Sequence, residues 1–97
     1  MTPVRLAALR ILAAAGDRGV TGRVFAERMW PDSPAWAHQS KAGTHGTRSG
    51  AGMPRAAGSL LSVMVREGLA QRDYGRDNRV STYYISEAGR RALKEAP

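Results

Sequence analysis

Hydrophobic and polar positions follow two different periods along this chain, and the change of period divides it into helices and strands. Helical spacing of apolar residues and helix-boundary residues predict four helices, over 4–15, 22–30, 53–67 and 87–95. Thr2-Pro3, Thr21 and Ser86 begin three of them. The segments 69–73 and 79–85 predict a β-hairpin around the polar turn 74–78, and Val20 predicts a short bridge or buried anchor. The fold class is therefore mainly α with a small β-hairpin.

The first helix carries apolar residues on two sides. One predicted face consists of Val4, Ala8, Ile11, Leu12 and Ala15. The nearly opposite face consists of Leu6, Leu9 and Ala13. A helix of this kind is either central or shared with a second chain. A homodimer through this helix and the C-terminal helix is one arrangement that would cover it.

The third helix divides into an apolar face and a polar stripe. Its apolar positions cluster on one side and are Ala57, Leu60, Leu61, Met64 and Val65. Arg55, Ser59, Ser62 and Arg66 follow one another at spacings of four, three and four residues, which places them on the opposite side. We expect this stripe to face outward.

Between the second and third helices lies a segment, 31–52, with no hydrophobic periodicity. It is rich in Gly, Ser and Thr and contains six Gly and Pro residues. A compact helix-turn-helix joins its helices by about 3–4 residues, so this connection is much longer than usual. Either it is an inserted loop that orders on a ligand, or part of it, over 34–41, forms a further short helix; Trp36 could pin it to the body of the domain.

Charge points to a polyanionic partner. The 97 residues, enough for a single domain over 1–97, carry a formal net charge of +7, with 15 Lys and Arg against 8 Asp and Glu. The stretch from Ser33 to Arg66 contains no acidic residue, but it includes the basic residues Lys41, Arg48 and Arg55. Charge of one sign in such a stretch favours a polyanion as the partner. The alternative is solubility charge in a genome that favours arginine codons.

Several classes of function find no support in the residues. The chain has no cysteine, and His38 and His45 have no Cys, Asp or Glu nearby, so we expect no metal site, no cofactor and no catalytic triad. No apolar run approaches the ~20 residues of a membrane span, and Arg10 interrupts the N-terminal apolar run that a signal peptide would need. We expect a cytoplasmic protein that is not an enzyme.

Two motifs carry a resemblance to a known family. Met64-Val65-Arg66-Glu67-Gly68-Leu69-Ala70-Gln71-Arg72 followed by Tyr83-Tyr84-Ile85-Ser86-Glu87-Ala88-Gly89-Arg90 resembles the end of the recognition helix, the wing and the following helix of bacterial winged helix-turn-helix regulators of the MarR and PadR kind. The segment 20–26 is similar to the entry to their first reading helix. The resemblance covers about 75 residues, and it fails over 31–52.

The resemblance implies sequence-specific binding of double-stranded DNA by a small bacterial or phage transcription regulator. The third helix would enter the major groove and the wing would touch an adjacent groove or the backbone. The implied contacts on the helix are Arg55, Ala56, Ser59 and Ser62, with Arg66 nearer the backbone; those on the wing are Arg76, Asn78 and Arg79. In the loop, Lys41 and Arg48 could follow a phosphate backbone, or the loop could be a flexible tether whose charge is incidental.

Two other functions stay open at this point. The chain could be an accessory DNA-binding protein of a phage or mobile element, of the excisionase or packaging kind. It could also be a protein-interaction module that uses the winged-helix shape without DNA, with the second apolar face of the first helix as its contact.

Overall fold

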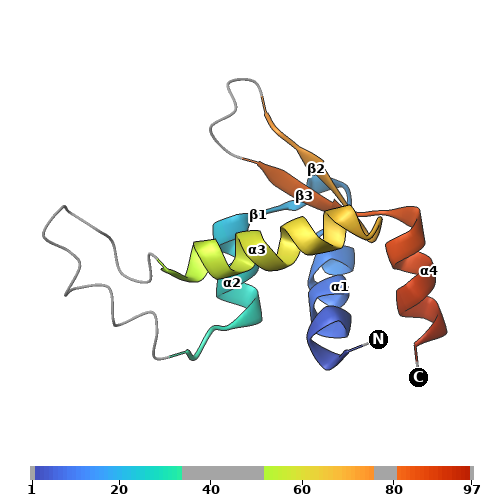
Figure 1. Ribbon diagram of the computed structural model, residues 1–97, viewed down its shortest axis with the longest axis horizontal. Helices are drawn as coiled ribbons and strands as arrows, with labels where there is room; N and C mark the ends of the chain where they lie inside the picture. The colour runs from blue at the N-terminus through green and yellow to red at the C-terminus, as the bar shows by residue number, and fades with distance from the viewer. Residues whose placement is uncertain (1, 34–51, 76–80, 97) are drawn as a thin grey trace, which may run out of the picture.

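The protein is mainly helical with a small three-stranded antiparallel sheet. The computed structural model describes residues 2–33, 52–75 and 81–96, with side chains from Arg55 onward in the second range. The elements in chain order are α1 (Pro3–Ala15), the 3₁₀ turn η1 (Gly16–Arg18), β1 (Val20–Thr21), α2 (Gly22–Met29), α3 (Gly52–Arg66), β2 (Ala70–Asp73), β3 (Thr82–Ile85) and α4 (Glu87–Glu95). Figure 1 shows α3 packed on α2 and passing in front of α1 in this view, with the hairpin to one side and α4 beside α1. The predicted class, mainly α with a small hairpin, is confirmed.

Hydroxyl side chains begin three of the helices, as the sequence predicted. Thr2 Oγ1 accepts a hydrogen bond of 3.2 Å from the Arg5 N–H, and Thr21 Oγ1 accepts one of 3.2 Å from the Val24 N–H. Ser86 Oγ accepts one of 2.9 Å from the Gly89 N–H. These bonds satisfy donors that have no partner within the first turn of a helix, so each fixes where its helix begins.

The Ser86 hydroxyl has a second partner. It donates a hydrogen bond of 2.6 Å to the carbonyl of Gly68, just after α3, and the Ser86 N–H donates one of 3.1 Å to the Leu69 carbonyl. The junction between β3 and α4 is thereby joined to the junction between α3 and β2.

The sheet has the strand order β1-β3-β2, so the short first strand pairs with the last one. Val20 lies opposite Tyr83 in β3, and Ala70 and Arg72 of β2 lie opposite Ile85 and Tyr83. The prediction for Val20 is confirmed, because it pairs and is buried. Of the predicted strand 79–85, the described part forms β3 from Thr82 onward; residues 76–80 lie outside the description.

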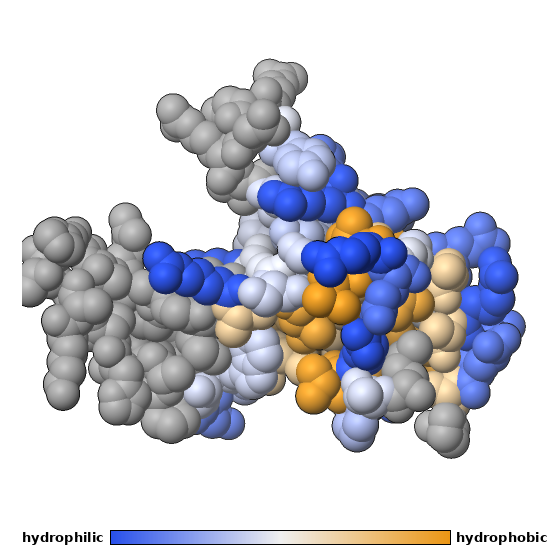
Figure 2. All heavy atoms as spheres, in the orientation of Figure 1, coloured by the Kyte–Doolittle hydropathy of each residue, from blue (hydrophilic) through white to orange (hydrophobic). Residues whose placement is uncertain are grey.

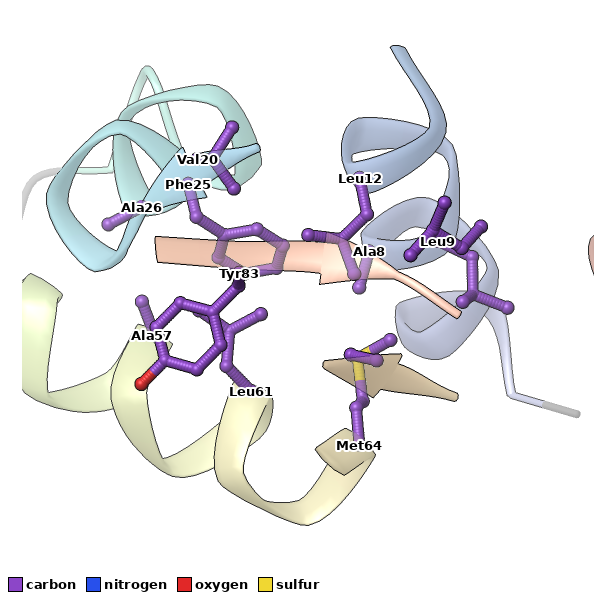
Figure 3. Close-up of a cluster of buried hydrophobic side chains, with 12 residues drawn as sticks. Ala8, Leu9, Leu12, Val20, Phe25, Ala26, Ala57, Leu61, Met64 and Tyr83 are labelled. Carbon is purple, nitrogen blue, oxygen red and sulfur yellow. The ribbon is translucent and has the colours of Figure 1, made fainter. Parts of the chain in front are cut away.

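One hydrophobic core joins α1, α2, α3 and the sheet (Figure 3). Its largest fully buried side chains are Phe25, Leu9, Leu12, Leu61 and Met64. Trp30 closes the end of α2 by packing edge-to-face against the Phe25 ring, with centroids 6.5 Å apart and an interplanar angle of 87°. The sheet adds Tyr83 and Ile85, and Ala92 and Leu93 of α4 are partly buried against the same core.

The predicted division of the first helix into two apolar faces is wrong. Leu9 is fully buried together with Ala8 and Leu12, whereas Val4 is 50% exposed. Residues 8, 9 and 12 are neighbours on a helix, since they differ by one, three and four positions, and they form the centre of one broad face. Ile11, Ala13 and Ala15 flank them and are partly buried against the same core, so residues of both predicted faces meet it together. Val4 lies one turn before this face and remains on the surface.

Two predicted boundaries also shift. Gly52, assigned to the loop 31–52, belongs to α3, and Trp30 follows α2 as its C-cap residue instead of ending it. Of the predicted insertion, Pro31, Asp32 and Ser33 are described; Trp36 and the short helix considered over 34–41 lie outside the described residues. None of the helices within the described ranges is long and apolar enough to cross a membrane.

A matched pair of glycine substitutions is expected to change stability in opposite directions. A Cβ at Gly89 in α4 would collide with the backbone carbonyl of Leu69, whereas a Cβ at Gly58 in α3 has no neighbour within 4 Å. We expect Gly89→Ala to lower the free energy of unfolding by about 1–3 kcal/mol through overpacking. Gly58→Ala should raise it by about 0.5–1 kcal/mol through helix propensity. Urea unfolding followed by circular dichroism measures both, and a stabilising Gly89→Ala would contradict the close approach of α4 to Leu69.

Candidate nucleic-acid interface

The end of α3 is fixed by a hydrogen-bonded glycine cap. The Leu69 N–H donates to the Met64 carbonyl at 2.9 Å and the Gly68 N–H donates to the Val65 carbonyl at 3.0 Å, with Gly68 at φ 81°. This pair of bonds is the Schellman arrangement, which ends a helix and sends the chain off in a new direction. Because β2 begins directly afterwards at Ala70, the cap sets the position of α3 relative to the hairpin.

The two faces of α3 separate as the sequence predicted. Ala57, Leu61 and Met64 are buried in the core, and Leu60 and Val65 are partly buried against it. On the other side Arg55, Ala56, Ser59 and Arg66 are exposed, and Ser62 is partly exposed. Val63, which the sequence did not single out, is also partly exposed. The structure therefore brings together all five predicted helix residues on one outward surface.

This surface has the length of three helical turns. Arg55 and Arg66 are eleven residues apart, which corresponds to about 16 Å along the axis and returns to the same side of the helix. Neither arginine forms an ion pair with any residue in the described ranges. Two cations thus lie at the ends of a ridge whose middle carries two serine hydroxyls.

The acid nearest to the ridge is engaged by another helix. Glu67 follows α3 directly, and its Oε1 lies 2.9 Å from Nε of Arg5 in α1. An exposed ion pair of this kind contributes about 0–1 kcal/mol to stability. Its consequence for the interface is that the Glu67 carboxylate pairs with Arg5 and not with Arg66.

The hairpin adds a third cation, Arg72, on the side that faces α3. Side chains alternate along a strand, so Arg72 shares its face of β2 with the buried Ala70, and both lie opposite core residues of β3. The guanidinium Cζ of Arg72 lies 4.3 Å from the ring centroid of Tyr74 and 5.7 Å from that of Tyr83. Its Nε donates a hydrogen bond of 2.9 Å to Ser81 Oγ.

Sequence reasoning missed Arg72, although the strand alternation next to the buried Ala70 indicated its side. The predicted hairpin contacts Arg76, Asn78 and Arg79 and the predicted loop contacts Lys41 and Arg48 lie outside the described residues.

Figure 2 shows the face on which α3 crosses α1. Hydrophilic side chains gather over the described part of the hairpin and around the ends of the helices, and a hydrophobic patch lies where α3 crosses α1. Among the residues described, no three His, Cys, Asp or Glu side chains come together in a group that could hold a metal ion.

Comparison with protein-family models, with curated proteins and with solved structures found no match for this chain.

Proposed function

We propose that the protein is a winged helix-turn-helix protein that binds double-stranded DNA in a sequence-specific manner as a small transcription regulator. In this proposal α2 and α3 form the helix-turn-helix with the segment 31–51 as its long connection, and the β2–β3 hairpin forms the wing. Support comes from the order of the elements, from the packing of α3 on α2, and from the pairing of β1 with β3 beside the hairpin.

The observation that carries the proposal is the outward ridge of α3. An arginine offers a planar fork that can bind guanine O6 and N7 together, and serine hydroxyls bind either bases or phosphates. The ridge presents Arg55, Ser59 and Ser62 in line, with Ala56 beside them and Arg66 at the far end. A helix with this exposed edge has the shape and the donors to enter a major groove, where Arg66 would reach the backbone.

The proposal also includes a second copy of the chain as a partner. Val4 is half exposed on α1, and α4 lies beside that helix, which supports a homodimer through these two elements. A two-fold dimer would place its two α3 helices about 34–36 Å apart and would bind an inverted repeat.

Selection of bound sequences from random duplex DNA tests the proposed function. We expect enrichment of one defined site, and an affinity for it that falls steeply with salt because phosphate contacts release counterions. An inverted repeat would identify the dimer, and a single half-site would identify a monomer. Failure to bind any duplex at low ionic strength would overturn the proposal.

A further inference from the structure

We propose that Arg72 is a pre-positioned contact for a phosphate of the DNA backbone, held in place by Tyr74, Tyr83 and Ser81. This inference rests on the proposed DNA binding and adds to it a specific residue at the base of the hairpin and the chemical group that the residue binds.

The first step is that the guanidinium of Arg72 lies against two aromatic rings. Tyr83 is 6% exposed and belongs to the core, where Figure 3 shows its ring pointing toward the turn of α3 that holds Ala57. Tyr74 is 55% exposed and lies at the surface. Both ring centroids are within the ~6 Å over which an aromatic face attracts a cation. The arginine is therefore fixed relative to the core and, through it, to α3.

The position of Tyr74 has its own cause. Asp73 Oδ1 accepts a hydrogen bond of 3.0 Å from the Gly75 N–H, which forms an Asx turn around Tyr74. Gly75 adopts φ 74°, a backbone conformation that is unfavourable for residues with a Cβ. This turn also engages the Asp73 carboxylate, which lies on the opposite face of β2 from Arg72.

The second step is that most of the donors on Arg72 have no partner within the described ranges. A guanidinium has five N–H groups, and the one on Nε points to Ser81 Oγ. The four N–H groups on the two Nη atoms have no acceptor among the described residues, and no carboxylate there pairs with the charge. Arg72 is exposed. An oriented guanidinium with paired N–H donors suits a phosphate, which accepts two parallel N–H bonds.

The third step is the location. Arg72 lies on the face of the hairpin that packs toward α3, on the strand that directly follows the end of α3. Hydrophilic side chains cover this part of the hairpin in Figure 2. A duplex that receives the ridge of α3 would bring its backbone, and not a base edge, past the base of the hairpin. We therefore assign phosphate and not base recognition to Arg72.

The test is the slope of log Kd against log salt concentration for a selected duplex and for a scrambled one. Arg72→Gln should weaken binding to both duplexes about tenfold at low salt and reduce the slope by about one. Tyr74→Leu and Arg72→Lys keep the charge, so each should keep the slope and lose affinity a few-fold by losing the stacked, planar arrangement.

Arg18→Gln is the matched control, because Arg18 is exposed on η1, outside the ridge, the hairpin and the two helices of the proposed dimer, and loses the same charge. Arg72→Gln with the affinity and slope of Arg18→Gln would overturn the inference, as would a loss confined to the selected site, which would indicate base recognition. If Arg72→Gln does not fold, Arg72→Lys decides, and wild-type affinity in that variant overturns the inference. Failure of the proposed function is distinguishable, because the wild-type protein would then bind neither duplex.

Discussion

Replacing Arg55 by alanine is expected to weaken binding to the selected duplex by about 1–3 kcal/mol, which is about 5- to 150-fold in Kd. The physical reason is the loss of the guanidinium that, in the proposed complex, binds one guanine edge through two hydrogen bonds. Because a base contact is lost, discrimination at one base pair of the site should relax as well. Fluorescence anisotropy with the selected duplex and with single-base variants of it measures both effects.

The structure supplies two controls for this measurement. Arg55 is exposed and forms no ion pair with a described residue, so Arg55→Ala should unfold at the wild-type temperature. Arg18→Ala removes the same charge from η1, outside the ridge, the hairpin and the proposed dimer helices, and should bind almost as the wild type does. Equal Kd values for Arg55→Ala and Arg18→Ala would show that the ridge of α3 does not read the DNA.

Truncation of Phe25 is expected to have the largest effect on stability. Phe25 is the largest of the fully buried side chains, and its ring packs edge-to-face against the ring of Trp30. Phe→Ala substitutions in cores cost about 3–5 kcal/mol, against about 5–15 kcal/mol for the stability of a whole domain. We therefore expect Phe25→Ala to lose a large part of its stability, which urea unfolding followed by circular dichroism measures.

Arg28→Ala is the corresponding control at the surface of the same helix. Arg28 is exposed on α2, and loss of its side chain should change the unfolding free energy by no more than about 0.5 kcal/mol. An equally small change for Phe25→Ala would contradict the core in which α2 packs against α1 and α3.

The parts of the fold that local chemistry determines could be predicted from the sequence. Thr2, Thr21 and Ser86 bond to backbone N–H groups three residues onward, so the beginning of each helix depends on neighbours along the chain. The two faces of α3 were also predictable. Its bulky apolar residues and its charged residues differ strongly in hydrophobicity. Their spacing places the two kinds on opposite faces of a helix in only one way.

The face of α1 was not predictable in this way, and the reason lies in its composition. Alanine fits both the buried and the exposed side of a helix, so it does little to distinguish them. Seven of the thirteen residues of α1 are alanine or arginine, which leaves few bulky apolar residues to mark the buried face. The sequence therefore left two directions open for the core. Contacts with α2 and β3, which are distant in sequence, decided in favour of Ala8, Leu9 and Leu12.

Arg72 was missed for a related reason. Judged from its neighbours along the chain, Arg72 is an ordinary charged residue of a hairpin. The contacts that distinguish it are made by residues on the other side of the turn. Tyr83 and Ser81 lie across the hairpin from Arg72. Their contacts with Arg72 depend on the register between β2 and β3, so they could be predicted only if that register were known. Cross-strand pairs of this kind depend on pairing that a single strand does not encode.

The two bonds of the Ser86 hydroxyl restrict which residues the chain can accept at that position. The side chain must accept from the Gly89 N–H and donate to the Gly68 carbonyl at once. Aspartate begins helices as well as serine does, but its ionised carboxylate only accepts, so it would face the Gly68 carbonyl with a repulsive oxygen. Threonine carries the same hydroxyl. Position 86 is thus open to variation only between the two small alcohols, because only they accept and donate at this buried junction at once.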